Sequence, residues 1–494
     1  GRGRRPDWGG RRRVGPARSG RLMELPTLLA ELDPAAAIEA PADLEAVEIA
    51  AIDHDSRRVG ADTLFCALVG RAFDGHRYIA EAVAAGASAV LVSADADVPA
   101  RSRGDAVVLR APDTRVAMAH LAAAHAGHPS RSLDVVGITG TNGKTTTVHL
   151  LAAIAAAAGT VTRTLGTLTG ERTTPEATDI QPLLASWVVD GVDLVVMEVS
   201  SHALVQHRVD GIDFTVAGFT NLTEDHLDFH PSLEDYFAAK ARLFSPERAA
   251  RGVAVADLPH GRLLVDSAEI PMIGIHPDAQ PVLSSTLTSI EFSWRDQIVR
   301  LPFGGRFNVA NATLAAEIAV VLGYSAGDIV AGLASATPVP GRFEPVSTGQ
   351  AFDVIVDYAH TPDGLERVLA SARIDSNEGR VLVVFGCGGD RDAVKRPLMG
   401  RAAEEGADVV IVTSDNPRTE DPGAIISEVL TGMSTTAVVI PDRRDAIGEA
   451  LALARPGDAV VVAGKGHETT QTVGSAHLPF DDRQVVRELL AAAE

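Results

Sequence analysis

Cysteine is scarce in this 494-residue chain, and its scarcity excludes a disulfide-built scaffold. Only Cys66 and Cys387 are present, and they lie far apart in the sequence. A disulfide framework needs more cysteines in a shorter chain. Neither cysteine has a zinc-ligand partner at a suitable spacing. We therefore expect two packing residues in a protein of a reducing, cytoplasmic compartment.

The chain also lacks long apolar runs and a basic surface. No run approaches the roughly 20 apolar residues that a membrane helix needs, which predicts a soluble protein without a membrane span. The formal net charge is −21, from 44 Lys and Arg against 65 Asp and Glu. Such acidity argues against a nucleic-acid enzyme. Phosphate groups, if bound, must be held by local side chains.

The first 22 residues depart from this acidic balance. They are rich in Arg, Gly and Pro and precede Met23, where periodic sequence begins. The segment lacks the apolar core of a secretory signal. We interpret residues 1–22 as a disordered basic extension. A nucleic-acid-binding arm is the alternative, which no downstream feature supports.

The length predicts about three domains. Residues 23–132 mix short β-like runs with Ala-rich helical stretches, and residues 133–338 include a β-rich insertion around residues 253–301. Residues 339–494 follow a Pro- and Gly-rich linker and alternate Val/Ile runs with helical stretches. That alternation predicts a parallel sheet covered on both faces. The fold class is α/β, with an N-terminal α/β domain, a central parallel-sheet domain and a C-terminal Rossmann-like domain.

A phosphate-binding motif is the strongest local signal. Gly137-Ile-Thr-Gly-Thr-Asn-Gly-Lys-Thr-Thr-Thr147 follows a strand-like run and leads into a helical stretch. Glycines let the backbone close around phosphates, and the start of a helix attracts anions. Lys144 can reach the β- and γ-phosphates of ATP, and a Thr hydroxyl can bind Mg²⁺. Ile138 stands where the usual P-loop has glycine, so Gly140 and Gly143 take over the turn. We expect a P-loop ATPase-like central domain.

The variant Gly140-Thr-Asn-Gly-Lys-Thr-Thr146 resembles the signature of Mur ligases and of folylpolyglutamate synthetases. Ordered motifs from about Asp55 to Asp482 resemble Mur ligases over nearly the whole chain. Thr173-Thr-Pro175, followed by Glu198-Val-Ser-Ser-His202, favours Mur ligases over the synthetases. The resemblance implies an ATP-dependent ligase that forms an amide bond.

Several residues match the family's catalytic and metal-binding positions. The catalytic set implied is Lys144, Glu198, His226 and Lys240. The metal ligands implied for Mg²⁺ are Thr145, Glu198, His226 and Lys240, with Lys240 carbamoylated to N6-carboxylysine. Addition of CO₂ would turn an ammonium that two Mg²⁺ ions repel into an anionic oxygen ligand for a hard cation.

The resemblance assigns further residues to three substrates. Those for ATP are Gly140, Thr141, Asn142, Gly143, Lys144, Thr145, Thr146, Asn308, Asn311, Arg342 and His360. Those for the UDP-muramoyl substrate, on the N-terminal and central domains, are Ser56, Thr173, Thr174, Ser200, Gln206 and Arg208. Those for the incoming amino acid, on the C-terminal domain, are Arg391, Asp415, Asn416, Pro417, Arg418, Gly464 and Glu468. The chain departs from the family at Arg172, where Asn is frequent.

The motif Asp415-Asn-Pro-Arg418 indicates which amino acid is added. Family members that add diaminopimelate keep this Arg, and lysine-adding relatives lack it. Diaminopimelate has a distal carboxylate that lysine does not have, and a bidentate Arg–carboxylate pair is strong and selective. Arg391 accompanies Arg418, and Glu468 can pair with the distal ammonium.

The implied reaction adds meso-diaminopimelate to UDP-N-acetylmuramoyl-L-alanyl-D-glutamate through an acyl phosphate, in peptidoglycan precursor synthesis. We expect a cytoplasmic monomer that requires Mg²⁺ and ATP and binds no nucleic acid. The alternatives are the same ligase with L-lysine or ornithine, and a folylpolyglutamate synthetase. A P-loop NTPase switch would leave the C-terminal motifs unexplained. A non-catalytic cell-wall scaffold would have lost catalytic residue types, and all of them are present.

Overall fold

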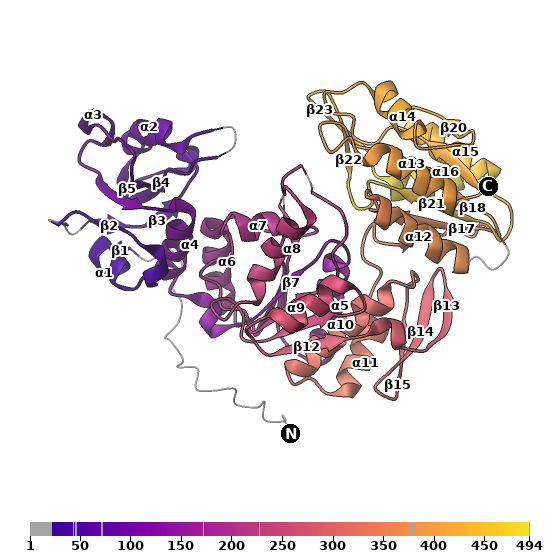
Figure 1. Cartoon of the computed structure of the whole chain (residues 1–494), viewed down its shortest axis with the longest axis horizontal. Helices are drawn as coiled ribbons and strands as arrows, with labels where there is room; N and C mark the ends of the chain where they lie inside the picture. The colour runs from indigo at the N-terminus through magenta and orange to yellow at the C-terminus, as the bar shows by residue number, and fades with distance from the viewer. Residues whose placement is uncertain are drawn as a thin grey trace.

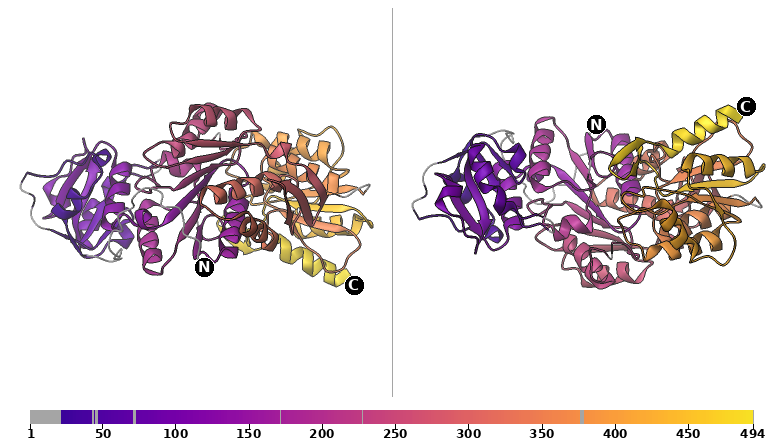
Figure 2. Two further views of the ribbon diagram at one scale, coloured as in Figure 1. Left: turned by 90° about the horizontal axis from the view of Figure 1, so that it is seen from below. Right: turned by 90° about the horizontal axis from the view of Figure 1, so that it is seen from above.

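The computed structural model describes residues 22–493 except 43, 45, 46, 71, 72, 171, 227 and 376–378. The basic extension expected at residues 1–22 lies outside the described residues, apart from Leu22. Three blocks follow one another through the molecule, from indigo through magenta to yellow (Figures 1 and 2). The central block lies between the other two, so its surfaces can form sites with both.

The N-terminal block is built on a four-stranded parallel sheet of order β3-β4-β5-β6, with a small antiparallel pair β1-β2 beside it. Its strands are β1 (Met23–Glu24), β2 (Glu48–Ile49), β3 (Ala51–Asp53), β4 (Thr63–Cys66), β5 (Ala87–Ser93) and β6 (Val107–Ala111). Its helices are α1 (Leu25–Ala30), α2 (Ile79–Ala84), α3 (Ala100–Arg103) and α4 (Thr114–His125). The Cys66 thiol is fully buried in this core, as expected of a packing residue.

The central block is built on a six-stranded parallel sheet of order β12-β11-β10-β7-β9-β8. Its strands are β7 (Asp134–Thr139), β8 (Thr162–Leu165), β9 (Leu194–Glu198), β10 (Val216–Phe219), β11 (Gly252–Val255) and β12 (Met272–Ile275). Its helices are α5 (Lys144–Ala157), α6 (Ala177–Val189), α7 (Ser201–Val205), α8 (Leu233–Ala241), α9 (Pro259–Ser267), α10 (Asn308–Val321) and α11 (Ala326–Ser335). Strand β7 lies inside the sheet, so the loop that follows it opens at the middle of the carboxyl edge, where parallel sheets bind ligands.

The expected β-rich insertion around residues 253–301 is wrong in its first part. Strands β11 and β12 are the last two parallel strands on one side of the central sheet, with β12 at the edge, and α9 joins them. Only β13 (Val282–Thr286), β14 (Ser289–Trp294) and β15 (Gln297–Leu301) form a separate antiparallel sheet. Strands β11 and β12 are short and contain glycine, so the hydrophobic periodicity of their sequences is weak. Their position in the sheet is set by pairing of β11 with β10 and of β12 with β11.

The C-terminal block contains the predicted parallel sheet, in the order β16-β17-β21-β18-β19-β20, with β16 antiparallel at one edge. Its strands are β16 (Glu344–Pro345), β17 (Asp353–Asp357), β18 (Val381–Phe385), β19 (Val409–Val412), β20 (Val438–Val439) and β21 (Ala459–Ala463), and a separate hairpin joins β22 (Thr470–Val473) to β23 (Ala476–Pro479). Its helices are α12 (Pro362–Asp375), α13 (Lys395–Gly406), α14 (Pro422–Leu430), α15 (Arg443–Leu453) and α16 (Asp482–Ala493). One core cluster packs α12, α13 and α14 on one face, and another packs α15 and α16 on the other. The prediction of a sheet covered on both faces is confirmed.

Within the described part of the chain, no helix is both long and apolar enough to cross a membrane.

Candidate active site

The loop between β7 and α5, residues 140–143, is here called the phosphate loop. Gly140 and Gly143 have φ values of 143° and 85°, which residues other than glycine rarely adopt. A Cβ at Gly140 would overlap the Thr220 hydroxyl, and one at Gly143 would overlap the Asn311 amide. Ile138, at the position of the missing glycine, is a buried residue within β7. The turn therefore starts two residues later than in the usual P-loop.

Lys144 opens α5 and folds back over the phosphate loop. Its Nζ donates to the carbonyl oxygens of Gly140 at 2.9 Å and Thr141 at 2.7 Å. Among the described residues it forms no ion pair, and burial lowers the pKa of the ammonium. The Nζ atom is thus held at the loop by carbonyl oxygens, and the nearby Glu198 and Asp225 carboxylates counteract part of the lowering of its pKa.

Glu198 ends β9, the strand next to β7, and its carboxylate meets the first turn of α5. Thr145 Oγ1 lies 3.0 Å from both carboxylate oxygens, and the Thr167 amide donates to Oε1 at 2.8 Å. The side chain is buried. A carboxylate and a hydroxyl at the start of a helix are the oxygen ligands that Mg²⁺ prefers.

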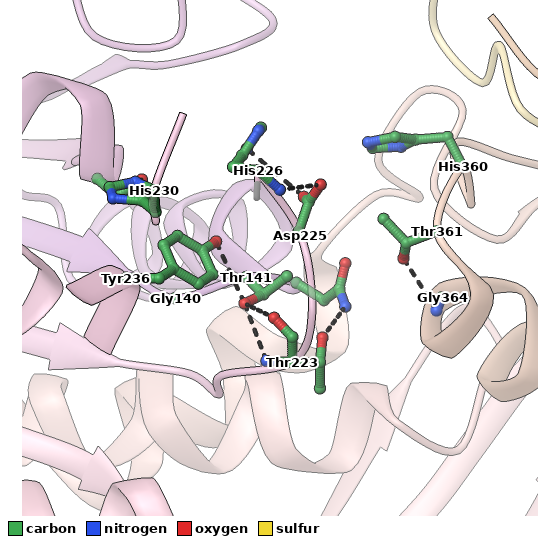
Figure 3. A network of polar contacts seen from close by, with 12 residues as sticks. Gly140, Thr141, Thr223, Asp225, His226, His230, Tyr236, His360, Thr361 and Gly364 are labelled. Atoms are coloured by element: carbon green, nitrogen blue, oxygen red, sulfur yellow. Dashed lines mark hydrogen bonds and ion pairs between the residues drawn. The ribbon is translucent and has the colours of Figure 1, made fainter. Parts of the chain in front are cut away.

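Lys240 reaches the same loop from α8 and is almost fully buried. Its Nζ donates to the Gly140 carbonyl at 2.8 Å and lies 4.3 Å from the centre of the Tyr236 ring. The Tyr236 hydroxyl accepts from Thr141 Oγ1 at 3.3 Å, so this helix is tied to the phosphate loop (Figure 3). Burial, with Lys144 nearby, lowers the pKa of Lys240 well below its ordinary value. A neutral amine is the form that reacts with CO₂.

His226 lies at the wall of the same site, in a left-handed backbone conformation with φ of 56°. Its ring is 3.5 Å from the Asp225 carboxylate and 4.9 Å, edge to face, from the His202 ring. Partial burial lowers the pKa of His226 to about 4, which keeps the imidazole neutral and able to bind a metal. Figure 3 shows Asp225 and His226 opposite His360, with no drawn side chain between them.

No group of three or more His, Cys, Asp or Glu side chains able to hold a metal occurs among the described residues. The expected ligand set differs from such a group, because it includes the Thr145 hydroxyl and a modified Lys240. Glu198 and Thr145 are already in contact and are oxygen donors, so this part fits Mg²⁺. Lys240 fits only in its carbamoylated form, since an ammonium cannot bind a cation.

A cavity of about 450 Å³ joins these side chains to the C-terminal block. Its lining includes Asn142, Lys144, Thr145, Glu198, His226, Asn311, Arg342, Tyr358 and His360. That volume is in the usual range for small-molecule sites. Gly140 and Lys240 lie behind this surface, and Asn308 supports it by accepting from Asn311 Nδ2 at 2.9 Å.

Side chains of the C-terminal block reach the phosphate loop directly. Asn142 Nδ2 donates to Asp363 Oδ2 at 3.0 Å, and Arg342 Nη2 lies 3.5 Å from Thr145 Oγ1. The Arg342 guanidinium lies over the Tyr358 ring at 4.4 Å. The expected nucleotide site is therefore formed by two blocks.

The residues expected to bind the UDP-muramoyl substrate lie together beside Glu198, except Ser56. Thr174 Oγ1 donates to the Glu198 carbonyl at 3.0 Å, and the Ser200 amide donates to Thr174 Oγ1 at 3.1 Å. Arg208 Nη1 donates to the Thr174 carbonyl at 2.9 Å. Gln206 accepts from Arg208 at 2.6 Å, and Thr173 contacts Thr167 at 3.0 Å.

Ser56 lies in the N-terminal block, where its hydroxyl donates to Glu81 at 3.4 Å. A nearby ion pair, Arg58–Asp179 at 2.8 Å, connects this block to α6 of the central block. The block that carries Ser56 is therefore in direct contact with the central block. Arg172, the departure from the family pattern, forms an ion pair with Glu176 at 2.6 Å.

The residues expected to bind the amino acid lie on loops that follow β18, β19 and β21. We call residues 386–392, 415–418 and 464–468 the amino-acid loops. Asn416 Nδ2 donates to Glu468 Oε2 at 2.8 Å, and a Cβ at Gly464 would lie 2.5 Å from the Asp415 carboxylate. A Cβ at Gly389 would overlap the Pro417 carbonyl. The loops pack this closely because glycine occupies both contacts.

The two expected arginines flank Gly388. A Cβ at Gly388 would lie 3.0 Å from Arg418 Nη1 and 3.9 Å from Arg391 Cγ. Arg418 has φ of 52°, and its Nη1 donates to the Gly389 carbonyl at 2.6 Å. Arg391 is exposed. The structure thus places both arginines at one edge of the amino-acid loops.

Several contacts in the site were missed by the sequence analysis. Thr167 and Asp363 occur in segments with no recognisable local signal. Lys465 lies in the sequence motif Gly464-Lys-Gly-His-Glu468, but the motif does not reveal that its side chain is buried or which residues it contacts. These residues are identified only by the folded arrangement.

Comparison with known proteins places these features in a family. Residues 48–126 match the model described as Mur ligase family, catalytic domain; residues 138–319 match Mur ligase middle domain; residues 341–466 match Mur ligase, glutamate ligase domain. The UDP-N-acetylmuramoyl-L-alanyl-D-glutamate--2,6-diaminopimelate ligase of Syntrophomonas wolfei is 45% identical over 90% of this chain and 95% of its own length. The ligase of that name from Streptomyces coelicolor is 43% identical over 96% and 98%.

A solved structure with the same enzyme name is 32% identical and superposes with a TM-score of 0.65, covering 92% of this chain and 97% of the other. Identity at this level over nearly full lengths exceeds what a shared fold alone requires. The order of the three matched regions also agrees with the order of the three blocks. The chain belongs to the Mur ligase family.

Proposed function

We propose that the chain is the ligase that joins meso-diaminopimelate to UDP-N-acetylmuramoyl-L-alanyl-D-glutamate at the expense of ATP. The observation that carries this proposal is the cavity in which Lys144, Thr145 and Glu198 face Arg342 and His360. A phosphate-binding loop enclosed by a second block suits a nucleotide that must be sequestered during transfer. The relatives' printed names support the choice of the two other substrates.

The proposed residue roles follow the geometry. Residues 140–146, Asn311, Arg342 and His360 hold ATP, with Asn308 behind Asn311. Thr173, Thr174, Ser200, Gln206 and Arg208 hold the muramoyl peptide, and Ser56 holds the uridine end. The amino-acid loops hold diaminopimelate through Arg391, Asp415, Asn416, Pro417, Arg418, Gly464 and Glu468. We also propose domain bounds at 23–132, 133–338 and 339–494.

The first step is phosphoryl transfer. An oxygen of the D-Glu γ-carboxylate attacks the γ-phosphorus of ATP, the bond to the β-phosphate oxygen breaks, and ADP leaves. Lys144 and the amide groups at the start of α5 stabilise the negative charge that spreads over the transferring group. Arg342, held over Tyr358, contacts the Thr145 hydroxyl from the opposite side of the cavity.

The second step is amide formation. The amine at the L centre of diaminopimelate attacks the acyl-phosphate carbon, the carbon–oxygen bond to phosphate breaks, and inorganic phosphate leaves with its electron pair. The amine loses a proton to solvent or to a base during this step. Arg418 and Glu468 hold the distal end of the amino acid, so the reacting amine is positioned and its effective concentration rises.

Thr145, Glu198, His226 and carbamoylated Lys240 would hold Mg²⁺. The ion supplies positive charge that neutralises the phosphate oxygens. Lys240 is suited to carbamoylation because burial favours the neutral amine, and its contact with Gly140 fixes the new carboxylate beside the phosphate loop. We place the reaction in the cytoplasm and expect a monomer.

A coupled assay tests the proposal. Purified enzyme is incubated with ATP, Mg²⁺ and the UDP-dipeptide, and phosphate release is followed with diaminopimelate, L-lysine or ornithine as the acceptor. Product mass identifies the new amide bond. Dependence of phosphate release on both the dipeptide and diaminopimelate is the expected result. Preference for lysine or ornithine would refute the amino-acid assignment, and amino-acid-independent hydrolysis would refute the ligase assignment.

A folylpolyglutamate synthetase is the second candidate, and the contacts beside Glu198 argue against it. Thr173 contacts Thr167, and Thr174 contacts Ser200, so these hydroxyl groups form a polar cluster in the central block beside Glu198. A folate-linked substrate would not require the ion-paired connection at Arg58 and Asp179. Addition of a folate substrate to the same assay should give no product.

A further inference from the structure

Lys465 is the lysine of the amino-acid loops, and it is not among the residues proposed to bind a substrate. Its side chain is fully buried. Nζ donates to Thr470 O at 2.6 Å, to Glu468 Oε2 at 3.1 Å and to Asn416 Oδ1 at 3.3 Å. An ammonium has three donors, and each has an acceptor here. Lys465 therefore connects the loop after β19, the loop after β21 and the β22–β23 hairpin.

These contacts fix the orientation of Asn416. Its Oδ1 accepts from Lys465 Nζ and also from the Thr472 amide at 2.9 Å. With two donors on the oxygen side, the amide nitrogen must face Glu468, to which it donates at 2.8 Å. A flipped amide would place its NH₂ group against an ammonium and an N–H group. Lys465 is thus a physical reason for the Asn416 orientation.

The same contacts fix the Glu468 carboxylate. Oε2 accepts from both Lys465 and Asn416, while the side chain stays 31% exposed. The second carboxylate oxygen therefore remains the one able to meet a substrate ammonium. The Asp415 carboxylate lies in the same buried region, where burial raises its pKa. Arg443 and Lys465 together offset the repulsion between the Asp415 and Glu468 carboxylates, and of these two cations Lys465 is the one that contacts Glu468.

We infer that Lys465 is a positioning residue for the incoming amino acid. It holds Asn416 and Glu468 in the geometry that recognises the substrate ammonium, and it does not touch the substrate. The inference rests on the proposed function, since it concerns the amino-acid substrate of that reaction. It predicts that Lys465 governs the KM for the amino acid and not the KM for ATP or the UDP-dipeptide.

The test uses the full-length protein and Lys465→Met, which removes the charge and keeps an unbranched side chain that is one atom shorter. We expect the KM for the amino acid to rise about 10- to 100-fold, because removal of the ammonium leaves the buried acceptors on Asn416 and Glu468 with one hydrogen-bond donor fewer. The KM for ATP and for the UDP-dipeptide should stay unchanged. Lys465→Gln, a shorter neutral side chain, should give a similar rise, so the result does not depend on the folding of one variant.

A matched control separates positioning from general loss of structure. Arg380 also forms an ion pair in the C-terminal block, with Asp458 at 2.6 Å, but it precedes β18 at the opposite end of the sheet. Arg380→Met should leave the KM for the amino acid unchanged. A rise as large as that of Lys465→Met would overturn the positioning role.

A double-mutant cycle tests whether Lys465 acts through Glu468. In the Glu468→Gln background, Lys465→Met should change the KM for the amino acid much less than in the wild type. Equal effects in both backgrounds, or an equal rise in all three KM values, would overturn the inference. Failure of the proposed function gives a different result, because the wild-type enzyme would then ligate no amino acid.

Discussion

The phosphate loop and the amino-acid loops both lie at the carboxyl ends of parallel strands, but they treat their cations differently. At the phosphate loop, Lys144 and Lys240 donate to backbone carbonyls. Beneath the amino-acid loops, Lys465 pairs with Glu468, and the fully buried Arg443 pairs with Asp482 at 2.7 Å. At the phosphate loop, burial favours the neutral amine of Lys240 and Lys144 forms no ion pair among the described residues, whereas the second region pairs its cations with carboxylates.

The difference matches the ligands proposed for the two regions. A triphosphate is strongly anionic, so a site in which the Lys144 ammonium donates to carbonyls and forms no ion pair among the described residues gains free energy when it binds. Diaminopimelate carries both carboxylate and ammonium groups. Its site therefore needs a cation or an anion at each matching position and gains nothing from an excess of one sign. Arg418 fits the same rule, because it donates to the Gly389 carbonyl and remains available for a carboxylate. Lys144 and Arg418, which donate to backbone carbonyls, are therefore expected to bind a substrate anion. Lys240, which also donates to a carbonyl, is expected to be carbamoylated.

The largest effect is expected at Lys240. Lys240→Ala should abolish ligation and leave the fold intact, because it removes the carbamate and its metal contact. Formate or acetate at millimolar concentration should restore part of the activity by supplying a carboxylate. Intact mass of the active wild-type enzyme, measured with and without CO₂, checks the modification. An active enzyme with an unmodified Lys240 would contradict the prediction.

The next effect concerns selectivity at Arg418. A site built on an Arg–carboxylate pair can discriminate by about 10⁴ or more, partly because a guanidinium left without its carboxylate penalises lysine. Arg418→Ala should lower kcat/KM for diaminopimelate sharply and bring it close to that for lysine. Binding of ATP and the UDP-dipeptide, measured by calorimetry, should stay unchanged. Selectivity that survives the substitution would show that Arg418 is not the discriminating cation.

A smaller loss is expected at Lys144. Lys144→Ala removes one preorganised charge from the transferring phosphoryl group, which should lower kcat by about 100-fold or more. Single-turnover phosphate release isolates this step from product release. Near-normal turnover would mean that the ATP site lies elsewhere. The phosphate loop would then not differ from the amino-acid loops by having a lysine available for a substrate anion.

The smallest effect is expected where a paired cation lies in solvent. Arg58 pairs with Asp179 between the N-terminal and central blocks, and its side chain is 46% exposed. An exposed ion pair of this kind contributes about 0–1 kcal/mol. Arg58→Ala should therefore change the free energy of unfolding, measured in urea, by less than about 1 kcal/mol. A larger loss would contradict this prediction and would show that the ion pairs of Arg58, with Asp179 and with Asp53 of its own block, stabilise the protein more than exposed pairs usually do.

Local sequence patterns predicted much of the fold and part of the site. The glycines at 140 and 143 indicate the turn because only glycine readily adopts its backbone conformation. The Val/Ile runs of the C-terminal block indicate buried strands because each run is short and flanked by helical stretches. The same approach misplaced β11 and β12, because short strands with a glycine have little periodic signal and take their place from a neighbour.

Contacts between distant segments could not be predicted in this way. Lys240 lies 100 residues from Gly140, and Asp363 lies 221 residues from Asn142. Resemblance to the family suggested Lys240 as a site residue, but not its contact with the Gly140 carbonyl. Neither the sequence nor the resemblance suggested Asp363 or the role of Lys465.

The sequence by itself determined the phosphate loop, the order of strands and helices in the C-terminal block and the excess of acidic residues. These follow from backbone preference, periodicity and composition, which act over a few residues or over the whole chain. The tertiary structure alone decided which cations are neutralised and which stay available. That depends on burial and on acceptors brought from other segments: Lys465 donates to Asn416 across 49 residues, whereas the hydrogen bonds of Lys144 within the described residues go to the carbonyls of its own loop.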